Sequence, residues 1–182
     1  VYDPFLTIVK RTGRTLEEKP LKEENGRYEM DFEHLKMLAE NPRNRMLILC
    51  SPHNPVGRVW TKEELECLAE ICIQNNVMIV TDEIHSDIVY GKGKHYPLLS
   101  LDKRYEDCFI HLSAPGKTFN MPGLKMSFAV IPNKNLKKRF DQMQLNLSLD
   151  IRNTFGVECV QACYTEAGIR WLAGLLDYLN TN

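Results

Sequence analysis

Short apolar segments alternate with segments of helical periodicity along this chain of 182 residues, and this alternation limits its possible folds more than any other feature. Four continuous apolar runs are typical of strands buried on both faces of a sheet, and they lie at residues 45–50, 77–81, 108–113 and 126–131. Apolar residues at helical spacing predict helices at 32–39, from 61 onward, and at 136–147, 154–167 and 169–179. The sequence therefore predicts a single α/β domain with three αβα layers and a mainly parallel central sheet.

Capping and turn residues support these boundaries. Asp31 can cap the first predicted helix, and Thr61 with Glu64 forms a capping box ahead of the second. Asn25 followed by Gly26 predicts a tight hairpin turn before the first helix.

Composition and charge narrow the class of protein. Hydrophobic residues make up 43% and charged residues 26% of the chain, as in an ordinary soluble domain. The formal net charge of −1 argues against nucleic acid or an anionic membrane as a main partner. No apolar run approaches the roughly 20 residues that a membrane-spanning helix needs. None of the six cysteines forms a C-x-x-C pair, so we expect reduced thiols in a cytoplasmic protein.

Ligands of parallel α/β sheets gather at the carboxyl ends of the strands, which directs attention to three loops. The first, residues 51–58, contains two prolines and a glycine that make a stiff bend around Asn54. A rigid turn with an asparagine chosen for turn chemistry explains this segment equally well.

The second loop begins with Asp82, directly after an apolar strand. A carboxylate at the edge of a buried sheet is costly unless it meets a cation or several donors, and a protonated pyridine nitrogen is a suitable partner. The alternative is that Asp82 is an ordinary loop carboxylate exposed to solvent. Glu83, His85 and Asp87 together could suggest a metal site, but their spacing matches no standard ligand set, so we expect no metal.

The third loop carries Lys117 in a turn of small residues that follows an apolar strand. A lysine amine in a partly dry cleft has a lowered pKa, which is what an imine-forming nucleophile needs. Gly116, Lys117 and Thr118 are superficially similar to a phosphate-binding P-loop. That motif requires a glycine at position 111, where this chain has His111, so we exclude it.

Together, four segments resemble fold-type-I pyridoxal 5′-phosphate (PLP) enzymes of the class I/II aminotransferase superfamily, and most closely the MalY/PatB-like cystathionine β-lyase (C–S lyase) branch. The similar segments are Tyr2–Phe5, Cys50–Trp60, Thr81–Asp87 and Ser113–Asn120. Their order and spacing also fit this family. The resemblance implies the large domain of the aspartate-aminotransferase-like fold, with PLP as the cofactor.

The resemblance assigns roles to four residues around the cofactor ring. Lys117 would hold PLP covalently and later move the proton at the substrate Cα. Asp82 would pair with the pyridine nitrogen, Asn54 would hydrogen-bond the 3-oxygen, and Tyr2 would stack on the ring.

Three further residues fall at cofactor-binding positions of the family. His85 stands where many aminotransferases carry a tyrosine that contacts the 3-oxygen. Ser113 and Lys125 lie near positions that contact the phosphate. Two departures weaken that phosphate site, because Gly116 replaces a serine and Lys125 stands where the family often has arginine or a neutral residue.

The implied activity is a C–S β-lyase reaction that yields pyruvate, ammonia and a thiol from an amino-acid substrate. A class I/II aminotransferase is the alternative, since it uses the same residues, and a non-catalytic regulatory or interaction domain ranks below both. Family members resemble obligate dimers, so we expect a homodimer of the complete protein. Residues 1–182 would be the central part of the PLP-binding large domain, lacking an N-terminal segment and the C-terminal small domain, and we expect this part alone to be inactive.

Overall fold

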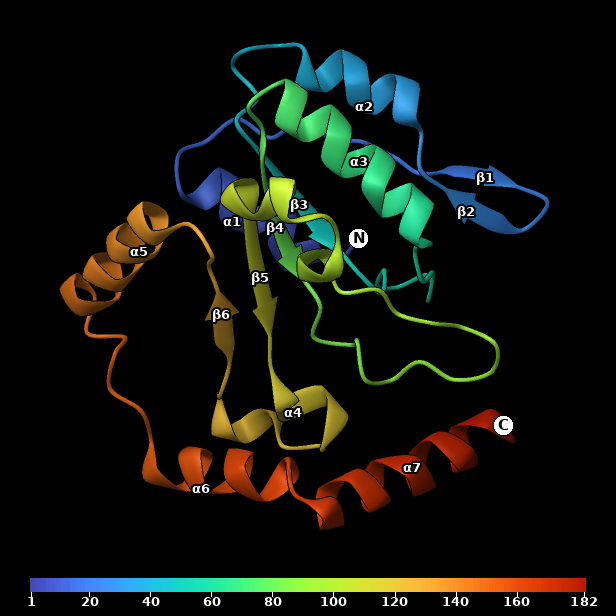
Figure 1. Cartoon of the computed structure of the whole chain (residues 1–182), viewed down its shortest axis with the longest axis vertical. Coiled ribbons are helices and arrows are strands. Elements are labelled where there is room, and N and C mark those ends of the chain that lie inside the picture. Colours follow the sequence, from blue (N-terminus) through green and yellow to red (C-terminus); the bar gives the residue numbers. More distant parts are fainter.

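A four-stranded sheet forms the centre of the computed structural model, which describes residues 1–182. Its strand order is β3–β4–β5–β6 (Figure 1). The strands are β3 (Met46–Cys50), β4 (Met78–Asp82), β5 (Phe109–Ser113) and β6 (Phe128–Val130). The first three are parallel and β6 is antiparallel to β5, which confirms the predicted α/β class with a mainly parallel sheet.

The register places the three loops of interest at one edge of this sheet. Cys50 pairs with Asp82, and Asp82 pairs with Leu112, so β3, β4 and β5 end side by side. Parallel strands with aligned carboxyl ends direct their following loops to the same place. The predicted gathering of these loops is therefore built into the sheet.

Two helices pack against one face of the sheet and form the main core with it (Figure 1). Helix α2 (Phe32–Ala39) begins at the predicted cap Asp31, and helix α3 (Lys62–Gln74) begins at the predicted capping box of Thr61 and Glu64. Their apolar faces are buried together with the strands because both helices keep apolar residues at helical spacing. The largest fully buried core side chains are Trp60, Leu65, Ile79, Leu98, Tyr105 and Phe109.

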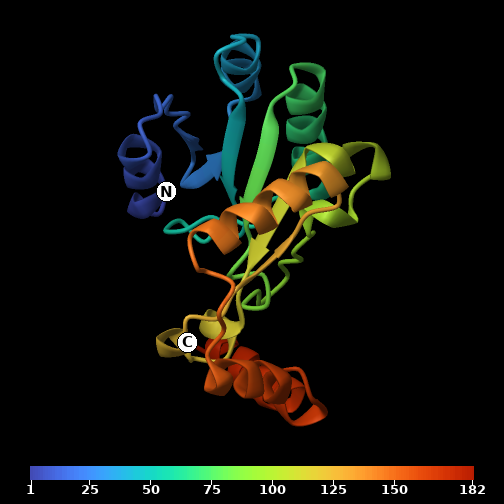
Figure 2. The same cartoon turned by 90° about the vertical axis from the view of Figure 1, so that its left-hand side faces the viewer.

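Peripheral elements surround this core. The hairpin of β1 (Lys22–Glu24) and β2 (Arg27–Glu29) turns at the predicted Asn-Gly pair. Helix α1 (Asp3–Arg11) lies on the side of the sheet opposite to α3 and has no buried residue, whereas α5 (Lys134–Asn146) lies beside β6 (Figure 2). Short 3₁₀ helices occur at η1 (Leu98–Ser100), η2 (Lys103–Cys108) and η3 (Pro122–Leu124).

Helices α6 (Thr154–Cys163) and α7 (Glu166–Asn180) lie beyond the carboxyl ends of the strands rather than on a face of the sheet (Figure 1). They lie next to the short helix α4 (Pro115–Thr118), where Phe119 packs on Tyr164 and Trp171 with ring centroids 5.7 and 5.9 Å apart. None of the helices is both long and apolar enough to span a membrane.

Candidate active site

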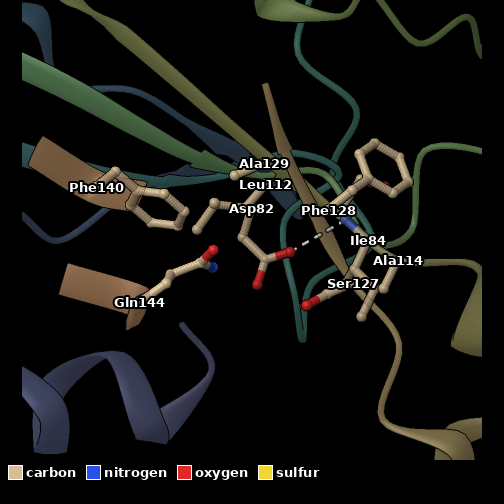
Figure 3. A pocket seen from close by; sticks show the side chains of 10 residues that line it. Asp82, Ile84, Leu112, Ala114, Ser127, Phe128, Ala129, Phe140 and Gln144 are labelled. Carbon is tan, nitrogen blue, oxygen red and sulfur yellow. Dashed lines mark hydrogen bonds between the residues drawn. The ribbon is translucent and has the colours of Figure 1, made fainter. Parts of the chain in front are cut away.

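A cavity of about 230 Å³ lies at the carboxyl ends of β4 and β5. It is lined by Asp82, Ile84, Leu112, Ser113, Ala114, Ser127, Phe128, Ala129, Phe140 and Gln144. One carboxylate oxygen of Asp82 accepts a hydrogen bond from the Ile84 amide at 3.0 Å. The other oxygen forms no hydrogen bond and faces the cavity near Gln144 (Figure 3). This edge of the sheet therefore offers a carboxylate oxygen to a cation or a hydrogen-bond donor.

Asp82 is held in place by the residue that follows it. Glu83 is 1% exposed, and its amide donates to the Leu112 carbonyl of β5 at 2.8 Å. One carboxylate oxygen of Glu83 accepts hydrogen bonds from Thr81 and from the Leu98 amide, and the other lies 2.6 Å from His95 Nε2. The loop that starts at Asp82 is thus fastened to β5 and to η1.

A third group, His111 of β5, completes the surroundings of this buried carboxylate, with Nδ1 at 3.2 Å from Glu83 Oε1. Burial alone would raise the pKa of Glu83, but the imidazoles of His111 and His95 and the Leu98 amide together lower it to about 2. An ion held by several donors in the interior is stabilised in its charged form. Glu83 is therefore ionised in the folded protein at neutral pH.

The low pKa of Glu83 predicts loss of stability in acid. Because the folded-state pKa lies below the ordinary value of 4.5, the stabilising contribution is complete above pH 4.5. It is lost progressively as the pH falls from 4.5 toward 2. We expect urea denaturation to show a falling free energy of unfolding over this range, with a flatter profile in Glu83→Gln. An equally steep profile in that variant would assign the acid sensitivity to other groups.

Asn54 lies on the first loop, and a buried thiol fixes its backbone. Cys50 Sγ accepts a hydrogen bond from the Asn54 amide at 3.3 Å and lies 3.3 Å from the Pro52 carbonyl. Burial raises the pKa of the Cys50 thiol, which keeps it protonated and able to donate. Since Cys50 pairs with Asp82 across the strands, Asn54 is held on the same edge as Asp82.

Lys117 and His85 belong to the neighbouring loops of this edge. Burial lowers the pKa of His85, the nearby Asp82 carboxylate acts in the opposite direction, and the Lys117 ammonium lowers it further. His85 therefore lies within electrostatic reach of both charged residues and is neutral at pH 7. Lys117 itself is exposed, so the partly dry cleft predicted for it is not provided by these residues alone.

The remaining predicted residues are less closely joined to this group. Ser113 lines the cavity with Asp82, and its hydroxyl donates weakly to the Glu83 carbonyl at 3.4 Å. Tyr2 is 50% exposed at the start of α1. Lys125 is exposed after η3, with a left-handed backbone conformation (φ 53°), and forms no ion pair or side-chain hydrogen bond.

The three residues considered for a metal site do not act together. Glu83 is buried between two histidines, His95 and His111, whereas Asp87 is exposed and accepts a hydrogen bond from Thr118. No group of three or more histidine, cysteine or acidic side chains is arranged to hold a metal ion.

Sequence reasoning missed several residues around this site. Phe140 and Gln144 of α5 line the cavity, and Ser127 joins them from the segment before β6 (Figure 3). Helical spacing shows which face of α5 is apolar, yet it does not show which strand end that face meets. The signal that was available was the helical spacing of Phe140 and Gln144, which lie one turn apart on the less exposed face of this mainly polar helix.

The sequence of this chain is similar to a known protein family and to proteins of known function. Residues 1–175 match the family model for aminotransferases of class I and II. The chain is 38% identical over 182 residues to cystathionine beta-lyase PatB of Bacillus subtilis, covering all of this chain and 47% of that protein. It thus spans about half the length of the curated relatives it matches.

Solved structures of PLP-containing proteins are also similar to this chain. Cystalysin from Treponema denticola, which contains a pyridoxal 5′-phosphate cofactor, is similar with a TM-score of 0.96 and 37% identity, over 100% of this chain and 46% of that one. The PLP-bound C-S lyase from Staphylococcus hominis is similar with a TM-score of 0.91 and 33% identity, over 99% of this chain and 44% of that one.

Proposed function

The chain belongs to the class I and II aminotransferase family, and from this premise we propose that it forms the PLP-binding large domain of a C–S β-lyase. The complete protein would convert a sulfur-containing amino acid such as cystathionine to pyruvate, ammonia and a thiol. One observation carries the proposal: the loops with Asp82, whose carboxylate has a free oxygen, and with Lys117, an exposed primary amine, follow neighbouring strands at one edge of the sheet.

The residues present fit PLP by the chemistry of their donors and acceptors. The free Asp82 oxygen suits a protonated ring nitrogen, and the Asn54 amide and His85 suit the 3-oxygen, although of these residues only Asp82 lines the cavity. The phosphate would contact Ser113 and Lys125, and two side chains are few for a phosphate site. A cavity of about 230 Å³ is also smaller than the roughly 300–1,000 Å³ of typical small-molecule sites, which agrees with further contacts from outside these segments.

PLP supplies an electron sink that stabilises a carbanion at the substrate Cα. The residues of this chain would hold the cofactor and the substrate in place and would move the proton of the substrate Cα. Lys117 Nζ would bind the cofactor, and once displaced by the substrate amine it would take the proton from Cα. Asp82 would keep the ring nitrogen protonated, because its carboxylate favours a positive partner. Tyr2 would cover one ring face, and the thiol would leave from Cβ.

An aminotransferase is the second candidate. Both reactions need Lys117, Asp82 and Asn54, and they differ in whether the proton leaves with β-elimination or returns to the cofactor carbon. The lyase is favoured because the similar proteins named above include a cystathionine β-lyase and a PLP-bound C–S lyase. The Asp82-Glu83-Ile84-His85 segment, typical of the lyase branch, points the same way. A non-catalytic domain ranks third, because all principal cofactor positions are filled.

The complete protein, saturated with PLP and given L-cystathionine, is expected to release pyruvate, ammonia and thiol in equal amounts without any added oxo acid. Turnover that requires an added 2-oxo acid acceptor would instead support the aminotransferase. A visible PLP band with no turnover of either kind would support a non-catalytic domain. Absence of both band and turnover would overturn the cofactor assignment.

We also propose that the complete protein is a cytoplasmic homodimer. All six cysteines are free, as expected in a reducing compartment. Exposed apolar side chains on the segment between α5 and α6, such as Ile151 at 81%, support burial against a further surface in the complete protein.

A further inference from the structure

Thr118, the residue after Lys117, links the turn that carries this lysine to the loop that carries Asp82. Its side chain is 1% exposed, and its hydroxyl donates to Asp87 Oδ2 at 3.0 Å. Asp87 lies five residues after Asp82 and two after His85 on the same loop. One hydrogen bond therefore connects two loops whose residues lie 31 positions apart.

The turn that carries Lys117 is held by buried neighbours, Ala114, Pro115 and Thr118, and by few hydrogen bonds. Helix α4 has only four residues, and its N-cap, Ala114, provides no side-chain hydrogen bond. So short a helix has little stability of its own. The bond from Thr118 to Asp87 is the one side-chain hydrogen bond that α4 makes, and it holds the residue next to Lys117.

Asp87, the acceptor of this bond, lies on the same loop as Asp82, and backbone hydrogen bonds hold that loop. The loop begins with the bond from the Glu83 amide to the Leu112 carbonyl, and it turns with the Ser86 amide donating to the Glu83 carbonyl at 2.9 Å. Asp87 follows this turn directly. Burial and the Asp87 carboxylate raise the pKa of Tyr164, the residue after α6, whose ring packs on Phe119 at 5.7 Å between centroids. Asp87 is exposed, but the hydrogen-bonded turn before it limits where its carboxylate can lie.

We propose that Thr118 and Asp87 form a positioning pair that sets the Lys117 amine relative to the Asp82 carboxylate. Its consequence for catalysis rests on the function proposed above, because only there must the amine reach a substrate Cα while Asp82 holds the ring. Neither residue touches the reacting atoms. Misplacement of a reacting group by about 1 Å can cost as much as 100-fold in rate, so a single bond of this kind has a measurable effect.

The first measurement is amide hydrogen exchange of the complete protein, with and without PLP, because it does not depend on turnover. The reporters are the amides of Phe119 and Met121, which donate to the Pro115 and Gly116 carbonyls. Loss of this part-buried hydrogen bond is expected to speed their exchange about tenfold in Thr118→Val and in Asp87→Ala. Thr118→Ser keeps the hydroxyl and is expected to exchange like the wild type, as is the control Thr7→Val in α1.

The second measurement is steady-state turnover of L-cystathionine by the same proteins. We expect kcat to fall on the order of 10- to 100-fold in Thr118→Val and in Asp87→Ala, with KM little changed and with recovery in Thr118→Ser. The double variant is expected to lose no more than the poorer single variant, because both changes break the same bond.

The possible outcomes distinguish failure of the proposed Thr118–Asp87 pair from failure of the proposed lyase reaction. Faster exchange in both variants, with recovery by serine, supports the pair even if the wild type turns over no substrate, in which case the proposed reaction alone fails. Wild-type exchange in Thr118→Val overturns the pair whether or not the protein is a lyase. A Thr118→Ser variant as defective as Thr118→Val, or losses that multiply in the double variant, also overturns it.

Discussion

Replacement of Lys117 by alanine is expected to abolish the saturable visible absorption band that the complete protein forms with PLP. Lys117 carries the primary amine of the group around Asp82, and alanine has no group that can bind the cofactor covalently. The same change removes the proposed base for the Cα proton, so turnover is expected to fall by at least about 10²- to 10⁴-fold. The measurement is a PLP titration followed by absorbance, beside a rate assay.

Two matched variants make this result specific to Lys117. Lys36→Ala removes another exposed lysine, in α2 at the opposite end of the sheet, and is expected to keep the wild-type band (Figure 1). Lys125→Ala removes the proposed phosphate contact and is expected to weaken PLP binding while the band still forms at saturation. A saturable band that persists in Lys117→Ala would show that another amine holds the cofactor.

The edge of the sheet that carries the site was predictable from the sequence. The apolar runs end at Cys50, Thr81 and Ser113, within one residue of the ends of β3, β4 and β5. A buried parallel strand has to be apolar throughout, and the first polar residue after it marks the carboxyl end. Asp82, which closes β4, and Asn54 were found in this way without any knowledge of their partners.

The partners of these residues were not predictable by the same reasoning. Periodicity shows which face of an element is buried, but it does not show which distant side chain that face meets. Glu83 and His111 are 28 positions apart and meet only because β4 and β5 are neighbours. The bond between Thr118 and Asp87 likewise depends on how α4 follows β5, which no local pattern encodes.

The surroundings of Lys117 differ from their prediction for a related reason. Apolar and small neighbours in the sequence suggested a partly dry cleft, whereas Lys117 is exposed. Burial of a side chain depends on what packs over it from elsewhere, and α6 and α7 lie against Phe119 rather than over the lysine. In relatives twice as long as this chain, other segments are available to cover that position.

Glu83→Ala is expected to be the most destabilising single change at this edge of the sheet, with a loss of about 3–5 kcal/mol in the free energy of unfolding. The carboxylate is 1% exposed and is the acceptor for the Thr81 hydroxyl, the Leu98 amide and His95 Nε2. Alanine leaves these donors buried without an acceptor and adds a small cavity. Desolvated donors without partners cost far more than their bonds contribute, which is why the loss exceeds that of one average hydrogen bond.

The variant Glu83→Gln shows how much of the stability loss comes from the negative charge of Glu83 and how much from the volume of its side chain. Glutamine keeps the volume and one acceptor oxygen, so a smaller loss of about 1–2 kcal/mol is expected from the poorer match with His95 and His111. Urea denaturation of the wild type, both variants and Glu24→Ala, an exposed hairpin control, measures these differences. A Glu83→Ala loss no larger than that of Glu24→Ala would mean that the network contributes nothing to stability. Because Glu83 also holds the start of the Asp82 loop, the order of the losses should reappear in PLP affinity, with alanine weaker than glutamine and glutamine weaker than the wild type.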